Sequence, residues 1–80
     1  MIAIQCKMAR TALGLGTRDL AALAKVSTDT IARLERGEAL KERTVEHIQR
    51  VLEEAGAIFL AENGEGPGVR LRKSDKGEAV

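Results

Sequence analysis

Aromatic residues are nearly absent from this sequence, which has one Phe and no Trp or Tyr among its 80 residues. Proteins that bind unpaired nucleic-acid strands stack the bases on aromatic side chains, so this composition argues against sequence-tolerant binding of single strands or RNA. Duplex DNA is read through its grooves and is the better candidate partner. The hydrophobic core must be aliphatic.

Cysteine is almost as scarce, because Cys6 is the only one. A lone cysteine forms neither an internal disulfide nor a zinc site, and no segment resembles a signal peptide or a membrane span. We therefore expect a cytoplasmic protein with no membrane partner, no metal and no cofactor. Eighty residues provide one domain with a modest core.

Catalytic patterns are also missing. No nucleophile–base pair, carboxylate pair or metal-ligand cluster is evident, so we do not expect an enzyme. His47 has no partner at ligand spacing and is expected to be a surface histidine. The glycine-rich segment 62–68 lacks the Lys-Ser/Thr pair and the following helix of a phosphate-binding loop.

Charge is present in both signs but is unevenly distributed. The net charge is +3 over residues 1–37, −4 over 38–68 and +2 over 69–80. This asymmetry suggests that the N-terminal half faces phosphates while another face is directed away from them.

Residues 17–37, TRDLAALAKVSTDTIARLERG, predict two short helices joined by a tight turn. Leu20, Ala21 and Leu23 give the first helix, to about Ala24, an apolar face. After Val26 in the turn, Ser27 can cap a second helix that spans 28–36 and stops at Gly37. Such a unit presents the start of its second helix outward, which suits insertion into the major groove of DNA.

Two further helices and two strands are expected around this unit. Ile4, Met8, Ala12 and Leu15 predict a first helix from Ile4 to Gly14, with Met8 in the core. After a loop over residues 38–43, a last helix ending at Gly56 has an apolar face, made by Val45, Ile48, Val51, Leu52 and Ala55. Alternating residues at 57–60 and 69–72 predict a short β-hairpin, and the polar tail 74–80 is expected to be disordered.

The sequence resembles the Xre or Cro/repressor family of bacterial and phage DNA-binding proteins over about residues 4–56. The resemblance is carried by residues of different chemistry at fixed spacing, namely Leu20-Ala21, Val26-Ser27, Ile31, Glu35-x-Gly37 and Arg10-x-x-x-Gly14. It implies a mainly α, lambda-repressor-like four-helix domain over residues 1–56, followed here by the hairpin at 57–73. It also implies an ion pair between Arg10 and Glu35 that links the first and third helices.

Base-reading residues are expected on the exposed side of the helix 28–36, opposite Ile31 and Leu34. The candidates are Ser27, Thr28, Asp29 and Arg33. Arg33 can donate two hydrogen bonds to a guanine. Asp29, four residues earlier, can either hold the Arg33 guanidinium or accept from a cytosine.

Phosphate contacts follow from the family resemblance, which places them at the start of the second helix and in the loop after the third. The matching positions are Gly16, Thr17, Arg36, Arg43 and Thr44, with Arg18 and Lys41 nearby. Thr17 stands where many relatives have Gln. Lys25 replaces the usual turn Gly, and a left-handed conformation there would cost roughly 1 kcal/mol.

A homodimer is expected because a single unit reads few base pairs. The candidate dimerisation residues are the apolar residues of the hairpin, Ile58, Phe59, Leu60, Val69 and Leu71. The function predicted is a transcriptional regulator, such as a repressor, that binds a palindromic operator in double-stranded DNA. Alternatives are the antitoxin of a toxin–antitoxin pair, with an unknown protein partner, and a pure protein-interaction module.

Overall fold

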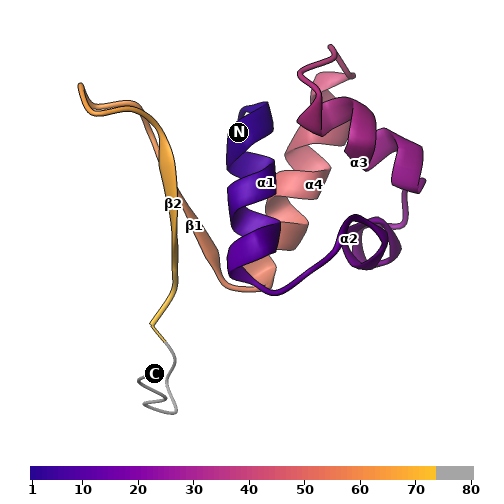
Figure 1. Cartoon of the computed structure of the whole chain (residues 1–80), viewed down its shortest axis with the longest axis horizontal. Helices are drawn as coiled ribbons and strands as arrows, with labels where there is room; N and C mark the ends of the chain where they lie inside the picture. The colour runs from indigo at the N-terminus through magenta and orange to yellow at the C-terminus, as the bar shows by residue number, and fades with distance from the viewer. Residues whose placement is uncertain (74–80) are drawn as a thin grey trace.

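The computed structural model describes residues 1–73, which form four helices and one antiparallel hairpin (Figure 1). In chain order these are α1 (Ala3–Ala12), α2 (Thr17–Ala24), α3 (Thr28–Glu35), α4 (Glu42–Glu54), β1 (Ala57–Leu60) and β2 (Gly68–Leu71). The fold is thus mainly helical, as the sequence pattern predicts. The tail 74–80, expected to be disordered, lies outside the described residues.

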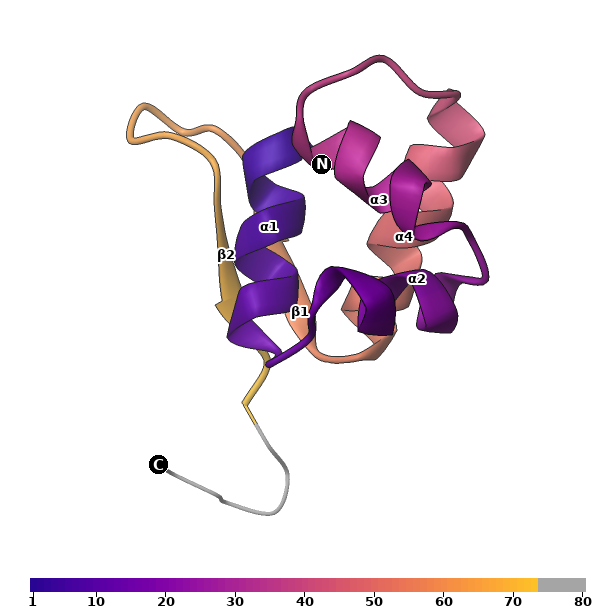
Figure 2. The ribbon, with the colours of Figure 1, turned by 45° about the vertical axis from the view of Figure 1, so that its right-hand side comes forward.

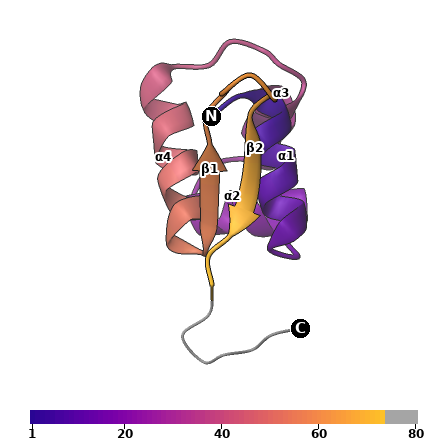
Figure 3. The same ribbon diagram turned by 90° about the vertical axis from the view of Figure 1, so that its left-hand side faces the viewer.

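The elements are arranged in three layers. Helices α1 and α4 stand side by side in the middle, with α2 and α3 against one side (Figure 1). The hairpin covers the other side of α1 and α4, and it lies in front of both helices when the molecule is turned by 90° (Figure 3). The α2–α3 unit and the hairpin therefore occupy opposite outer layers.

The core is aliphatic and relies on small residues where helices meet. Its fully buried large side chains are Leu20, Ile31, Ile48 and Leu52. Cys6, Ala9, Ala21, Ala24 and Ala57 are also buried, and side chains of this size let neighbouring backbones approach closely. Because Ala57 belongs to β1, the hairpin shares this core with the helices.

The buried face of α1 differs from the predicted one. Ile4, expected in the core, is 52% exposed, Ala12 is exposed, and Met8 is only partly buried. The helix instead turns Gln5, Cys6 and Ala9 inward. Cys6 and Ala9 are small enough to let α1 pack between two layers, and Gln5 faces inward because it bonds to the hairpin, so size and hydrogen bonding outweigh hydrophobicity here.

The turn after α2 is closed by Lys25 in the left-handed conformation, with φ 58° and ψ 44°. The Val26 N–H donates to Ala21 O at 3.0 Å, and the Lys25 N–H donates to Ala22 O at 3.3 Å. These two bonds are the usual way to satisfy carbonyls at a helix end, although Gly normally occupies the Lys25 position. Leu23, expected on the apolar face of this helix, is 53% exposed, whereas Leu20, Ala21 and Ala24 are buried.

Helix α4 begins at Glu42, inside the loop expected to extend to residue 43. Ile48 and Leu52 are fully buried, whereas Ala55, expected on the same apolar face, is exposed. His47 is exposed, as predicted, but its Nε2 lies 2.8 Å from Ala24 O. This contact ties α4 to the last residue of α2.

The hairpin has one face on the helices and one face outward. Its register pairs Ala57 with Leu71 and Phe59 with Val69. Phe59 and Val69 pack against the core, so these two candidate dimerisation residues are engaged within their own chain. Because side chains alternate along a strand, Ile58 and Leu60 lie on the opposite, outer face.

Gln5 joins the first helix to the loop end of the hairpin, where β1 ends and β2 begins. Its Nε2 donates to Leu60 O and Gly68 O, both at 3.1 Å, and its Oε1 accepts from the Ile2 N–H at 3.0 Å. The side chain is almost fully buried, and these bonds satisfy both ends of its amide.

Helices long and apolar enough to cross a bilayer are not found within residues 1–73.

Candidate nucleic-acid interface

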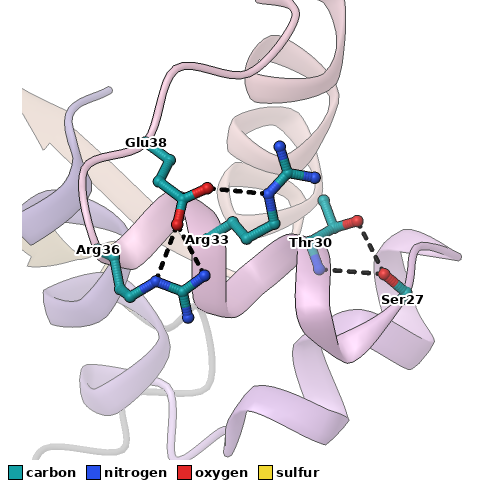
Figure 4. Close-up of polar contacts among 5 residues, drawn as sticks. All are labelled: Ser27, Thr30, Arg33, Arg36 and Glu38. Carbon is teal, nitrogen blue, oxygen red and sulfur yellow. Dashed lines mark hydrogen bonds and ion pairs between the residues drawn. The ribbon is translucent and has the colours of Figure 1, made fainter.

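Helix α3 begins at a side-chain cap provided by Ser27. The Ser27 Oγ accepts from the Thr30 N–H at 3.0 Å and lies 2.9 Å from the Thr30 hydroxyl (Figure 4). This cap fixes the first turn of α3 and leaves Thr28 and Asp29 exposed on it. Ile31 and Leu34 are buried, so the helix is anchored through one face and open to solvent on the other.

Arg33 and Arg36 are bridged by the carboxylate of Glu38 (Figure 4). Arg33 Nε donates to Glu38 Oε1 at 3.1 Å. Arg36 donates to Glu38 Oε2 through Nε at 3.0 Å and through Nη2 at 2.7 Å. The hydrogen bonds from Arg36 and then from Arg33 hold the pKa of Glu38 below its ordinary value, so the bridge is ionised at neutral pH.

The partner of Arg33 is therefore Glu38, so Asp29 does not hold the Arg33 guanidinium, which was one of the two roles expected for it. Asp29 is exposed in the first turn of α3. A carboxylate at this position interacts favourably with the partial positive charge of the helix N-terminus. The side chain remains free to accept from a ligand in the other predicted role.

A shallow groove brings together candidates from different elements. It is lined by Thr30 and Arg33 of α3, by Ala39 and Leu40 of the following loop, and by Lys41 and Thr44 at the start of α4. The predicted base reader Arg33 thus shares one concavity with two predicted phosphate contacts. Cationic and hydroxyl groups at the rim of a groove provide the donors that phosphate oxygens accept.

The other predicted phosphate contacts lie at the start of α2 and on α4. Gly16 precedes α2, and its N–H is already used, because it donates to Asp19 Oδ2 at 2.7 Å. Thr17 is partly exposed, and Arg18 and Arg43 are exposed. The chain enters α2 at the bottom of Figure 2 while the loop after α3 runs across the top, so these contacts would flank α3 on two sides.

Beneath α3, Arg10 and Glu35 form the ion pair that the family resemblance implies. Arg10 Nε donates to Glu35 Oε2 at 2.7 Å, and Nη2 donates to Oε1 at 3.0 Å. The Arg10 Nη1 also donates to Leu15 O at 3.3 Å. The hydrogen bond to Glu35 raises the pKa of Arg10, and burial together with Glu35 raises the pKa of the Cys6 thiol to about 12.

No protein-family model matches this sequence, and no curated protein is significantly similar to it. Groups of three or more His, Cys, Asp or Glu side chains that could hold a metal ion are not found within residues 1–73.

Two residues of this surface were not found by reasoning from sequence. Thr30 lines the groove and supports the cap of Ser27, and its position three residues after the cap is the signal that could have revealed it. Glu38 was expected only as the first residue of the loop 38–43, within the segment 38–68 of net charge −4. Its spacing of five residues from Arg33 and two from Arg36 has no helical periodicity, because the chain leaves α3 between them.

Proposed function

We propose that this protein is a sequence-specific transcriptional regulator that binds double-stranded DNA through α3. The proposal includes the finer fold assignment, in which α2 and α3 form the helix-turn-helix of a lambda-repressor-like domain. One observation carries it: α3 is anchored by Ile31 and Leu34 while its capped N-terminal turn and Arg33 face solvent in an outer layer of the molecule.

The geometry of the turn supports this assignment. Helices α2 and α3 are separated by three residues, and the left-handed Lys25 reverses the chain direction within that space. The buried Ala21 allows the two helices to cross closely, with Ile31 fully buried beside them. A unit of this kind holds its second helix rigidly enough to enter a major groove.

The positions of the hydrogen-bond donors support separate roles in base reading and in phosphate contact. Arg33 would read a guanine, with Thr28, Asp29 and Ser27 beside it, since these residues lie on the exposed side of the capped helix. Lys41 and Thr44 in the groove, Arg43 nearby, Arg36 after α3, and Gly16, Thr17 and Arg18 before α2 would hold the backbone. Backbone contacts fix the register of the helix, and base contacts provide sequence preference.

Homodimerisation is part of the proposal, with the outer face of the hairpin meeting a second copy. Ile58 and Leu60 lie on that face, and the strands of a two-stranded sheet retain unpaired edges. The hairpin and α3 lie toward opposite ends of the long axis of the molecule, which measures 36 Å (Figure 1). Two copies joined through their hairpins would thus hold their α3 helices farther apart than two copies joined through a face nearer α3.

This arrangement has a measurable consequence for the operator. One turn of DNA is about 34–36 Å, and a hairpin-mediated dimer is expected to read half-sites centred more than one turn apart. A dimer formed through a helical face nearer α3 would read half-sites one turn apart. The spacing of half-sites therefore reports which surface joins the two copies.

Selection of bound sites from a pool of randomised duplexes tests the proposal directly. Enrichment of a symmetric sequence, with binding that weakens as salt increases, is the expected result. An unenriched pool with salt-dependent binding would remove sequence specificity from the proposal. A chain that binds no duplex at low salt would overturn it and leave the protein-interaction reading.

A further inference from the structure

We propose that Glu38 sets the balance between specificity and affinity at this surface, by positioning Arg33 for a base and withholding Arg36 from phosphate. The inference rests on the proposed function and goes beyond it, because it assigns a role to an acidic residue that would otherwise only repel DNA. It is carried by the difference between the two halves of the Glu38 bridge.

Toward Arg33, the bridge uses only one of the five N–H groups of the guanidinium. Glu38 Oε1 accepts from Nε at 3.1 Å, and the two terminal nitrogens of Arg33 make no hydrogen bond to residues 1–73 (Figure 4). These nitrogens are sufficient for a bidentate contact with O6 and N7 of guanine. A carboxylate bound at Nε fixes the plane of the guanidinium, so less freedom is lost when Arg33 meets the base.

Toward Arg36, the same carboxylate occupies one whole edge of the guanidinium. Glu38 Oε2 accepts from both Nε and Nη2, at 3.0 and 2.7 Å. A phosphate oxygen that approaches this edge must displace an anion that is already hydrogen-bonded there. Arg36 is thereby weakened as a backbone contact, although its position after α3 suits that role.

The expected effect of Glu38→Gln follows from these two halves. Release of Arg36 adds about one phosphate contact, which corresponds to about five- to tenfold tighter binding of random duplexes at about 0.1 M salt. The slope of log affinity against log salt should become steeper by about 0.9. Discrimination at the base read by Arg33 should fall by about three- to tenfold, since the guanidinium is no longer held.

Glu42→Gln is the matched control. Glu42 is exposed in the first turn of α4, close in sequence to Glu38, and it makes no ion pair within the described residues. This variant changes the net charge by the same amount without touching either arginine. The role of Glu38 is supported only if its variant exceeds this control in both affinity and loss of discrimination.

Arg36→Ala, introduced with and without Glu38→Gln, isolates the second half of the proposal. In the otherwise unchanged chain, Arg36→Ala should weaken binding of random duplexes by less than about twofold. In the Glu38→Gln background, the same change should cost about five- to tenfold. Equal costs in the two backgrounds would show that Glu38 does not withhold Arg36.

NMR signals of the Nε–H groups of Arg33 and Arg36 provide a readout in the free protein. Both are expected to be slowed in exchange in the unchanged chain and fast in the Glu38→Gln variant. If the unchanged chain binds its selected site but Glu38→Gln and Glu42→Gln behave alike, this inference is overturned while the proposed function stands. A chain that binds no duplex overturns both.

Discussion

Arg10 and Glu35, which lie 25 positions apart in the sequence, meet in a two-pronged ion pair beneath α3, with side chains only 16% and 11% exposed. The pair joins the last turn of α1 to the last residue of α3. Its geometry fixes the angle at which α3 is presented, and the same carboxylate also accepts from the Cys6 thiol at 3.5 Å.

Loss of one partner of this pair should be costly. Glu35→Gln leaves the Arg10 guanidinium largely buried without a counter-charge, and we expect the free energy of unfolding to fall by about 2–4 kcal/mol. Urea unfolding followed by circular dichroism measures this change. The double variant Arg10→Met, Glu35→Leu removes both charges and should recover part of the loss. A loss below about 0.5 kcal/mol for the single variant would show that the ion pair does not stabilise the fold.

The raised pKa of Cys6 predicts that the stability of the protein decreases at alkaline pH. The pKa of this thiol is raised from 9.0 to about 12 in the folded chain, first by burial and then by Glu35. Above pH 9 the unfolded chain loses the thiol proton and the folded chain retains it, so the stability present below pH 9 decreases as the pH rises toward 12. The difference in unfolding free energy between the unchanged chain and Cys6→Ala should thus shrink between pH 8 and pH 10.5. A constant difference would contradict the shift.

Replacement of Lys25 by glycine should stabilise the protein. The Lys25 φ of 58° strains any residue with a side chain, so Lys25→Gly should raise the free energy of unfolding by up to roughly 1 kcal/mol. Gly14→Ala is the converse control, because Gly14 has φ 74° and open space where a Cβ would lie. Thermal unfolding should shift in opposite directions for the two variants. A lower stability for Lys25→Gly would mean that the lysine side chain stabilises the turn.

Arg33 and Arg43 should differ in how their loss affects DNA binding. Arg33→Ala is expected to weaken binding to the preferred site by about 1–3 kcal/mol and to reduce the base preference at one position in each half-site. Arg43→Ala should weaken binding to all duplexes about equally and reduce the dependence of affinity on salt. Fluorescence anisotropy with single-base variants of the selected site measures both. Unchanged base preferences in the Arg33 variant would remove it as the base reader.

Hairpin substitutions should separate folding from dimerisation. Ile58→Lys changes the outer face, so the variant should fold but lose self-association in sedimentation equilibrium. Phe59→Asp places a charge against the core and should lower the free energy of unfolding by about 2–4 kcal/mol. If Ile58→Lys associates as tightly as the unchanged chain, the interface lies on the helices. Deletion of residues 57–80 is a poor test, because it removes the buried Ala57.

Local sequence signals predicted α2, α3 and the pairing of the strands closely. Ser27 and Gly37 mark the ends of α3 by mechanisms that act within a few residues, through a side-chain cap and a positive φ of 86°. The same holds for Lys25. Such features depend little on the rest of the chain, which explains why they could be read before the fold was known.

The inward face of α1 and the bridge at Glu38 could not be predicted in this way. Ile4 and Met8 are more hydrophobic than Gln5 and Cys6, yet the latter pair faces inward because the hairpin supplies carbonyls for Gln5 and the helices approach too closely for larger side chains. Glu38 meets Arg33 only after the chain has turned out of α3. Both outcomes depend on contacts between elements, which hydrophobic periodicity does not encode.

The bonds from Gln5 to Leu60 and Gly68 span 55 and 63 positions of the chain. During synthesis, α1 leaves the ribosome well before the carbonyls of Leu60 and Gly68 that complete its surroundings. The α2–α3 unit is made between α1 and the hairpin. The core that supports it is therefore complete only after translation has passed the second strand. Chains that end before that point would contain all of α3 but only an incomplete core, and we expect them to be susceptible to proteolysis.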